Sequence, residues 1–344
     1  MGMTMTQKIL AAHCGQEHVK AGQLIEANLD IVLGNDITTP VAINEFEKAG
    51  FCDVFDKTRV NIVLDHFVPN KDIKSAQQSK QCREFACRHG IVNFFDVGKM
   101  GVEHALLPEQ GIVTAGDCII GADSHTCTYG AVGAFSTGVG STDMAAGMAT
   151  GKAWFKVPAA IKVELTGALR PFVTAKDISL EVLRLLSVKG GVGHVMEWGG
   201  PGIARLSVPE RATITNMGTE LGATTSIFPS DEVTRAFLKA QGREADFTPL
   251  SADPDAAYDR VIHIDLDTLE PLIACPHMPD NVVTVRSLKG TKVDQVCVGS
   301  CTNSSLYDLL KTAAMLKGRT VAPSVSMSVS PGSRQVLTML ANCG

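Results

Sequence analysis

The chain has 344 residues, of which 45% are hydrophobic and 32 are glycine, and its formal net charge is −5. This length is sufficient for two or three domains, each with its own core. The negative charge, with no basic run longer than a pair, argues against nucleic acid as the main partner. No stretch approaches the roughly 18 apolar residues of a membrane span and residues 1–8 lack a secretory signal, so we expect a cytoplasmic protein.

Ten cysteines are scattered through the sequence, and no two of them form a C-x-x-C motif. In a chain of this size without a secretory signal, reduced thiols are expected rather than a disulfide framework. We therefore expect most of these thiols to be packing residues. They stand at positions 14, 52, 82, 87, 118, 127, 275, 297, 301 and 343.

Strand and helix patterns alternate through the first part of the chain. Short apolar runs at residues 30–33 and 60–64 are typical of buried strands, and residues 75–89 have helical spacing closed by Gly90. Residues 91–97 return as a strand. This βαβ order predicts an α/β fold with mainly parallel sheets and helices on their faces.

Polar residues directly follow two of the predicted strands. Asp65 and His66 come after the strand at 60–64, and Asp-Ser-His at 123–125 comes after a strand at 117–122. Ligands of parallel sheets collect at the C-terminal ends of the strands. We therefore expect two Asp/His pairs at the same edge of one sheet.

A carboxylate beside an imidazole suits acid–base chemistry near neutral pH, because the carboxylate fixes the ring tautomer and raises the basicity of the ring. A single Asp-His dipeptide is more often a surface or capping pair. With two such pairs at two strand ends, the catalytic and the structural interpretations both stay open on the residues alone.

The glycine-rich segment at 130–151 does not match a nucleotide-binding loop. Residues 138–143 begin like a dinucleotide fingerprint, but position 143 is aspartate where the third glycine belongs, and no phosphate-binding P-loop occurs in the chain. We interpret these glycines as close-packing and turn positions. They open a helix that we expect to start near Ser141, with Ser141 or Thr142 as its N-cap.

Two breaks in the pattern suggest domain boundaries. The first lies near Pro158, before an alternating strand at 161–167. The second is the loop at 273–282, whose two prolines within four residues favour a rigid linker. We expect domains at residues 1–157, 158–285 and 286–344.

Asn216 and Glu220 stand four residues apart in a predicted helix. This spacing places both side chains on one face, so both can reach the same cleft. As a bare pattern it is more often a solvated polar face, although the neighbouring Met217 and Leu221 are apolar.

Cys301 lies on a predicted tight turn at 299–303, between a strand at 293–298 and a helix at 304–317. Backbone N–H groups at such a turn and the positive end of the helix favour an anion, which includes a thiolate or the sulfides of an iron–sulfur cluster. Cys301 is therefore a candidate metal ligand or reactive thiol. The alternative is a small buried hydrophobe at a turn.

Four short motifs in one order resemble those of the aconitase superfamily. They are Leu64-Asp-His66, Gly121-Ala-Asp-Ser-His-Thr126, Asn216-Met-Gly-Thr-Glu220 and Gly299-Ser-Cys-Thr-Asn303. The resemblance runs from Met1 to Gly344, and four motifs together are much more specific than one. It implies an aconitase-like fold of three α/β domains, and a large subunit of a two-subunit iron–sulfur hydro-lyase.

The resemblance also implies roles for individual residues. Cys301 would be a ligand of a 4Fe-4S cluster, with Asn216 near it, and Glu220 would orient the imidazole of His125. The catalytic residues would be Asp65, His66, His104, Asp123, Ser124, His125 and Glu220. The substrate-binding residues would be Asn35, Asp36 and Asn216, although an Asx turn before Thr38 explains Asn35 equally well.

The implied substrate is a 2-hydroxy dicarboxylate, isomerised by dehydration and rehydration. The resemblance offers 3-isopropylmalate of leucine biosynthesis first, with dimethylmalate, homoaconitate or citrate behind. The implied partner is a small subunit that carries a swivelling domain and the catalytic serine base, in a heterodimer or heterotetramer.

In the family, two further cluster cysteines form a C-x-x-C motif downstream of the segment that corresponds to Pro331-Gly-Ser333, and this sequence does not contain it. We therefore expect an incomplete third domain, and we expect residues 1–344 alone to hold no cluster and to be inactive. The second class of function is accordingly a cluster-free fragment that only binds a partner subunit. Iron and sulfide analysis after anaerobic reconstitution distinguishes the two.

Overall fold

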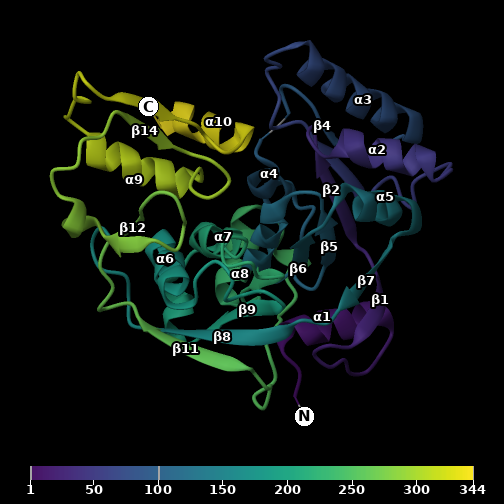
Figure 1. The fold of residues 1–344 in the computed structure, drawn as a ribbon, viewed down its shortest axis with the longest axis horizontal. Coiled ribbons are helices and arrows are strands. Elements are labelled where there is room, and N and C mark those ends of the chain that lie inside the picture. The colour runs from purple at the N-terminus through teal and green to yellow at the C-terminus, as the bar shows by residue number, and fades with distance from the viewer. Residues whose placement is uncertain (1, 100, 344) are drawn as a thin grey trace.

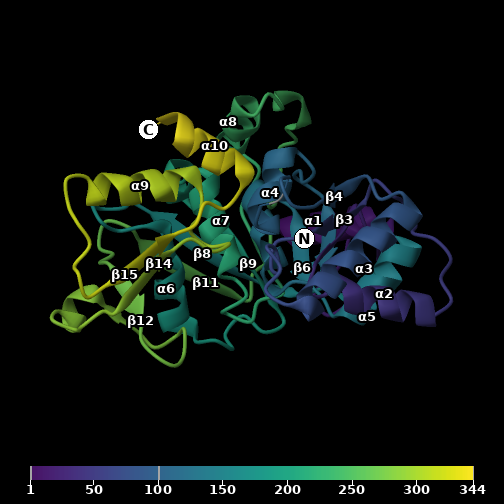
Figure 2. The same cartoon turned by 90° about the horizontal axis from the view of Figure 1, so that it is seen from above.

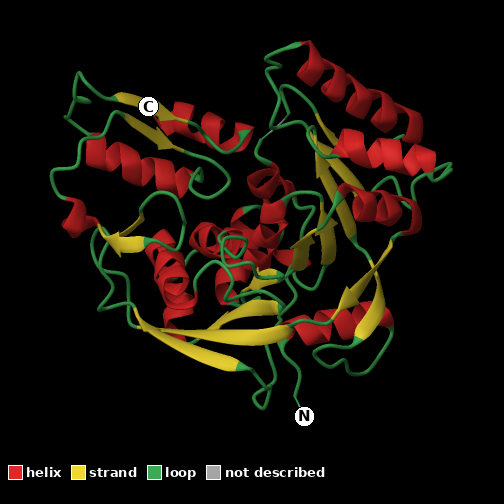
Figure 3. Cartoon of the chain, in the orientation of Figure 1, coloured by secondary structure: helices red, strands yellow, loops and turns green. Residues whose placement is uncertain are grey.

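The computed structural model describes residues 2–99 and 101–343, and within them three parallel sheets follow one another along the chain. Helices flank the strands of each sheet (Figure 1, Figure 3). The predicted α/β class with mainly parallel sheets is thereby confirmed. The three sheets fall in the three predicted segments, while the boundaries at 157/158 and 285/286 stay a prediction.

The first sheet has five parallel strands in the order β4-β3-β2-β5-β6. They are β2 (Ile31–Asn35), β3 (Val60–Val63), β4 (Asn93–Phe95), β5 (Cys118–Gly121) and β6 (Phe135–Gly138). The chain moves outward from β2 to β4 and then returns to the other side of β2, so the strand order reverses between β2 and β5. Such a switch point leaves a crevice at the carboxyl ends of the strands, where α/β sheets usually bind ligands.

Both faces of this sheet are buried, because alternate strand residues enter two different cores. Val32 and Ile120 pack with the helices of one face, while Leu33 and Ile119 pack with those of the other. The first face is covered by α2 (Thr39–Lys48), α3 (Ile73–His89) and α5 (Ser141–Thr150), and the second by α4 (Glu103–Gln110) and the 3-10 helix η1 (Ser124–Val132). Burial on both sides explains why the strands read as continuous apolar runs.

The second sheet has four parallel strands in the order β10-β9-β8-β11. Its elements are β8 (Ala159–Thr166), α6 (Ala175–Leu186), β9 (His194–Gly199), η2 (Pro201–Arg205), α7 (Val208–Asn216), β10 (Thr225–Ile227), α8 (Glu232–Ala240), η3 (Glu244–Asp246) and β11 (Arg260–Asp265). Buried Glu197 of β9 accepts hydrogen bonds from the backbone N–H groups of Met5 and Thr6, at the start of α1 (Met5–Cys14). The N-terminal helix is thus attached to the second sheet. An antiparallel ribbon of β1 (Leu24–Asn28) and β7 (Lys152–Lys156) lies beside α1.

The third sheet pairs β14 (Gln295–Val298) with β15 (Ser326–Val329) in parallel, with α9 (Leu306–Leu316) between them in sequence and α10 (Arg334–Cys343) after them. It is preceded by the antiparallel pair β12 (Leu272–Ala274) and β13 (Val282–Thr284) and by η4 (Val285–Leu288). The segment before α10 lies against the segment before α4, since Val102 donates its backbone N–H to the Gly332 carbonyl at 2.7 Å. Figure 2 shows α10 close to α4 accordingly.

Four local predictions need correction. The N-cap of α5 is Gly140, not Ser141 or Thr142, because the Ser141 hydroxyl donates to the Thr38 carbonyl instead. The helix α7 ends at Asn216, so Glu220 lies on the turns that follow and not on the same helix. The predicted helices at 304 and 331 begin two and three residues later, at Leu306 and Arg334.

None of the helices in the described part of the chain combines the length and the apolar character that crossing a membrane requires.

Candidate active site

The candidate site lies at the switch point of the first sheet. Asn35 is the last residue of β2 and Asp36 follows it, Asp65 and His66 follow β3, and Asp123 follows β5. The Nε2 atom of His66 lies 3.8 Å from Oδ2 of Asp123. The two Asp/His pairs therefore meet at one sheet edge, as the sequence predicts.

His66 is held by the carboxylate of its own pair. Its Nδ1 atom lies 2.6 Å from Oδ1 of Asp65, and the other Asp65 oxygen accepts the backbone N–H of Glu103 at 2.7 Å. The backbone N–H of His66 donates to buried Asp36. The hydrogen bond with Asp65 raises the pKa of His66, against a smaller opposing effect of burial. Because Asp65 occupies Nδ1, the Nε2 side of the ring faces the site.

Asp123 collects donors from several elements. Its Oδ1 accepts the backbone N–H of His125 at 2.8 Å and lies 2.9 Å from Nε2 of His104, and its Oδ2 accepts Nδ2 of Asn35 at 3.3 Å. Burial opposes ionisation, but the hydrogen bonds from His104 and His125 hold the pKa of this carboxyl well below its ordinary value. Asp123 is therefore a carboxylate throughout the neutral range.

His125 lies between two carboxylates. Its Nε2 is 3.2 Å from Oε1 of Glu220, while Nδ1 is 3.7 Å from Oδ1 of Asp123 and 3.4 Å from the Ser124 hydroxyl. The Asp123 and Glu220 carboxylates together raise the pKa of His125 to about 10. The ring is therefore an imidazolium near neutral pH, with a proton available on a partly exposed side chain.

His104 forms the buried wall of the site. It lies on α4. Its Nε2 atom is hydrogen-bonded to Oδ1 of Asp123, and its Nδ1 atom lies 3.3 Å from the Tyr129 hydroxyl. The ring centroids of His104 and His125 are 6.4 Å apart. Both nitrogens of His104 are thus engaged by protein groups.

The cysteine turn joins this site from the third sheet. Gly299 and Ser300 have positive φ angles of 148° and 69°, which turn the chain between β14 and α9 as predicted. Cys301 Sγ lies 3.9 Å from Oδ1 of Asn216, and the Thr302 hydroxyl donates to the same oxygen at 2.8 Å. Asn216 and Glu220 therefore serve one site, although they do not share a helix.

Asn35 is fully engaged inside the protein. Its Oδ1 accepts the backbone N–H groups of Ile37 and Thr38, which is the Asx turn considered from the sequence. Its Nδ2 donates to Glu103 and to Asp123. Direct binding of substrate by Asn35, and by Asp36 beside it, stays a prediction.

Sequence reasoning missed Glu103. A glutamate in the first turn of a helix is ordinarily an exposed residue that favours the helix dipole, so nothing in the pattern indicated burial. In the structure Glu103 is 0% exposed and lies among the site residues. Burial, reinforced by Asp65 and Asp123, raises the pKa of this carboxyl well above its ordinary value.

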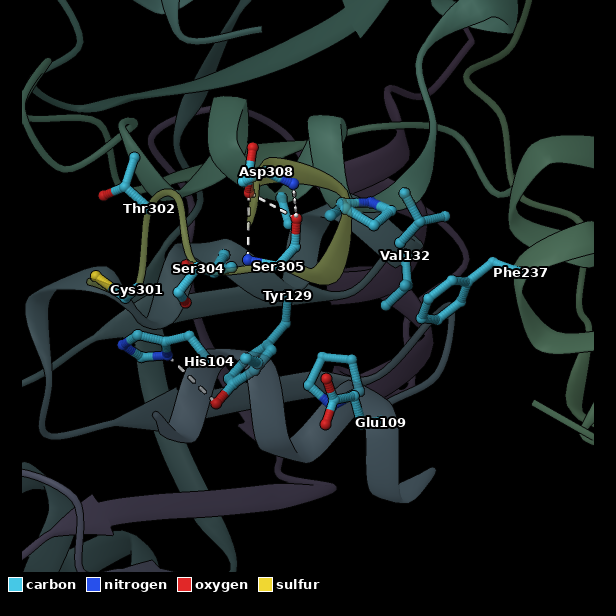
Figure 4. Close-up of a pocket in the computed structure, with 17 residues that line it drawn as sticks. His104, Glu109, Tyr129, Val132, Phe237, Cys301, Thr302, Ser304, Ser305 and Asp308 are labelled. Carbon is cyan, nitrogen blue, oxygen red and sulfur yellow. Dashed lines mark hydrogen bonds between the residues drawn. The ribbon is translucent and has the colours of Figure 1, made fainter. Parts of the chain in front are cut away.

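A pocket borders the site on the side of α4 (Figure 4). His104 and Cys301 line one end, and Val132 and Phe237 line the other. Its remaining walls combine alanine, proline and valine side chains from α4, η1 and α7 with polar side chains. The polar ones are Glu109, Thr128, Tyr129, Thr302, Ser304, Ser305 and Asp308. The thiol of Cys301 therefore has this pocket on one side and the acid–base residues on the other.

There are two groups of three residues in which each residue offers one possible metal-ligand atom, and the three atoms of a group lie within 4.8 Å of one another. One is Asp36, Asp65 and His66, and the other is Glu103, His104 and Asp123. In both groups hydrogen bonds join members to each other or to neighbouring protein groups, which suits proton chemistry. Cys301 is the residue whose soft thiolate suits an iron–sulfur cluster.

The comparison with protein families matches the model described as "Aconitase family (aconitate hydratase)" over residues 7–344. Among solved structures, the holo-form of aconitase X from Thermococcus kodakaraensis has a TM-score of 0.52 and 13% identity, and the match covers 99% of this chain and 80% of that one. At this identity the likeness supports the fold alone.

Several relatives are much more similar in sequence. A 3-isopropylmalate dehydratase large subunit from Clostridioides difficile (strain 630) is 56% identical, over 98% of this chain and 80% of the relative. Another from Helicobacter hepaticus is 53% identical, over 100% and 82%. A 2,3-dimethylmalate dehydratase large subunit from Eubacterium barkeri is also 53% identical, over 98% and 80%.

The position of Glu220 leads to a prediction about His125. In Glu220→Gln, loss of one of the two carboxylates that stabilise the imidazolium should lower the pKa of His125 by about one unit or more. NMR titration of the ring nitrogens measures this. Glu232→Gln, an exposed glutamate on α8, is the control and should leave the titration unchanged. An unchanged His125 titration in Glu220→Gln would contradict the assignment.

Proposed function

The chain belongs to the aconitase family, and we propose that it is the large subunit of a 3-isopropylmalate dehydratase, a hydro-lyase. Relatives with that name are more than 50% identical across nearly the whole chain. The observation that carries the proposal is the convergence of two Asp/His pairs at the switch point, next to the turn that presents Cys301. This arrangement suits the removal and addition of water at a 2-hydroxy dicarboxylate.

The proposed reaction needs two proton movements. A proton leaves the carbon beside the hydroxyl-bearing carbon, and the hydroxyl leaves with a second proton as water. Rehydration with the positions exchanged completes the isomerisation. The groups of this chain supply the proton for the leaving hydroxyl, and we assign the base that removes the carbon-bound proton to the small subunit.

We assign His66 as the donor to the leaving hydroxyl. Asp65 holds Nδ1 and leaves Nε2 toward the site, and the ring is 37% exposed, so a substrate can reach it. The hydrogen bond with Asp65 raises the pKa of His66 above its ordinary value, which favours the protonated ring. After donating its proton, the neutral ring keeps its orientation through Asp65, ready to take a proton back in the reverse step.

We assign His125 to charge stabilisation and to proton exchange beside His66. Glu220, Ser124 and Asp123 surround the ring, which fixes its plane. Its positive charge favours a substrate carboxylate in a region where three aspartates would otherwise repel one. His104 and Asn35 support Asp123, and in this proposal they act through it.

The donor set is compatible with an iron–sulfur cluster at one position. Cys301 is partly buried and stands on a turn before the positive end of α9, where backbone N–H groups favour a thiolate. Among the described residues, neither of the two three-residue groups includes Cys301. Cys301 is the one cluster ligand that we assign. When bound, a 4Fe-4S cluster supplies a Lewis-acidic iron that polarises the substrate hydroxyl.

Partner and location are part of the proposal. The names of the relatives state that they are large subunits, and we propose a small subunit as the partner, in a heterodimer or heterotetramer. We also propose a cytoplasmic location, which suits ten cysteines that are all free thiols.

A second candidate substrate is 2,3-dimethylmalate, which the Eubacterium barkeri relative favours at similar identity. The test is an assay on both compounds of the assembled two-subunit enzyme with its cluster reconstituted, in which the large subunit has the full length of its relatives and so includes the C-x-x-C cysteines. We expect the higher kcat/KM with 3-isopropylmalate. A higher value with 2,3-dimethylmalate would assign the chain to the second activity, and turnover of neither would reject both.

The role of Cys301 leads to a prediction about iron content. In the same full-length, cluster-loaded enzyme, Cys301→Ser should lose the 4Fe-4S absorption band, because a hydroxyl is a poor ligand for this soft site. Iron and sulfide analysis quantifies the loss. Cys297→Ser, an exposed thiol on β14, is the matched control and should keep its cluster. Full cluster content in Cys301→Ser would remove Cys301 from the ligand set.

The acid–base assignment predicts a kinetic loss. His66→Asn and His125→Asn should each lower kcat by about 10²-fold or more, since each removes a positioned proton donor. Circular dichroism should show that both variants remain folded. His263→Asn serves as the control, because its side chain is 68% exposed on β11. Unchanged turnover in either site variant would make that histidine structural.

A further inference from the structure

Glu103 is a buried acid that the proposed mechanism does not use. Its side chain is 0% exposed, at the first position of α4. One oxygen, Oε1, accepts Nδ2 of Asn35 at 3.0 Å. The other, Oε2, is buried without a hydrogen-bond partner among the described residues.

The groups around Glu103 supply more negative than positive charge. The nearest imidazole nitrogen is His104 Nε2, at 3.8 Å from Oε1, and that nitrogen is already on Asp123 at 2.9 Å. The titratable groups that face this region come from four elements. They are Asp36 after β2, Asp65 and His66 after β3, His104 on α4, and Asp123, His125 and Tyr129 at or in η1.

An ionised Glu103 would therefore be unfavourable. A buried carboxylate needs several donors or a cation, and Glu103 has one neutral amide donor. Its charge would add a fourth carboxylate to the three aspartates. A carboxylic acid in the same place keeps the Asn35 hydrogen bond and places a proton on the unpartnered oxygen. Burial and the aspartates both shift the pKa of Glu103 in that direction.

We propose that Glu103 is a positioning residue that stays a neutral carboxylic acid at neutral pH, holding Asn35 against Asp123 without adding charge to the acid–base site. The Nδ2 group of Asn35 donates to Glu103 Oε1 and to Asp123 Oδ2. Glu103 therefore orients the Asn35 amide, and the Asn35 amide in turn orients Asp123. A second charge beside Asp123 would make His66 and His125 hold their protons more tightly. The neutral acid avoids this effect.

The stored proton has a consequence for stability. The folded state keeps a proton that the unfolded chain releases above a pKa of about 4.3. Stability therefore falls as the pH rises above that value, and the loss continues until the pH reaches the raised pKa of the folded state. Glu103→Gln removes this titration while keeping the shape and the neutral charge of the side chain.

The first experiment measures unfolding equilibria of wild type and Glu103→Gln by urea titration at several pH values. The unfolding constant of the wild type, divided by that of the variant, should rise about tenfold per unit between roughly pH 5 and pH 7. Glu232→Gln is the matched control, because Glu232 also stands at the first position of a helix but is 82% exposed. Its ratio should stay constant.

A constant or falling ratio for Glu103→Gln would overturn the proposal, because it would mean that Glu103 is ionised in the folded state. Failure of this variant to fold at pH 7, with Glu232→Gln folded, would overturn it as well, since a neutral isostere should replace a neutral acid. These outcomes need neither cluster, substrate nor small subunit. They therefore do not depend on whether the proposed dehydratase function is correct.

The second experiment tests positioning, and this part rests on the proposed function. In the assembled enzyme, Glu103→Ala should lower kcat by about tenfold or more, because Asn35 and Asp123 lose their support. Glu103→Gln should restore most of that loss. If Gln restores none of it while the stability ratio rises as expected, the stored proton stands and the positioning role is wrong. If wild type has no dehydratase activity, the proposed function fails and the stability result still decides the proton.

Discussion

One carboxylate, Asp123, holds the acid–base site together. Its two oxygens accept hydrogen bonds from the His104 ring on α4, from the His125 backbone N–H in η1 and from the Asn35 amide at the end of β2. The Oδ2 atom also faces the His66 ring, which follows β3. These contacts are possible because β2, β3 and β5 are parallel and end at one level, so their C-terminal residues converge. A one-residue slip of β5 would shift the segment after it, which carries Asp123, along the sheet and break these contacts. The register of the sheet is therefore a requirement of the site.

The site carries its negative charge by giving each aspartate its own donors. Asp36 accepts hydrogen bonds from the backbone N–H groups of His66 and Phe67. Asp65 is hydrogen-bonded to the His66 ring and accepts the backbone N–H of Glu103. These donors satisfy carboxylate oxygens that burial removes from water. The same carboxylates orient the histidines, and they raise the pKa values of His66 and His125. Acid and base strength in this crevice thus follow from where three strands end.

The sequence predicted what depends on local pattern and failed where tertiary contacts decide. Apolar runs predicted the parallel strands, and the Asp/His pairs after two of them predicted their meeting. Gly90 ends α3 as the sequence predicts, and its φ of 63° is one that glycine adopts without strain. The early end of α7 was not predicted, and just beyond it Gly218 lies close against Ser226 of β10, a tertiary contact that the sequence pattern does not reveal. Burial of Glu103 was equally invisible, because it depends on the crevice and not on its neighbours in sequence.

The end of α7 connects the two chemical halves of the site. Asn216, at the last position of the helix, accepts the Thr302 hydroxyl beside Cys301, and Glu220, on the turns that follow, holds His125. A second hydrogen bond runs from the Thr213 hydroxyl to the Thr302 carbonyl. The distance between the thiol and the imidazolium is therefore set by five residues of one short segment. Because α7 ends at Asn216, the turns that follow it determine where Glu220 lies. They place its carboxylate 3.2 Å from Nε2 of His125, in η1.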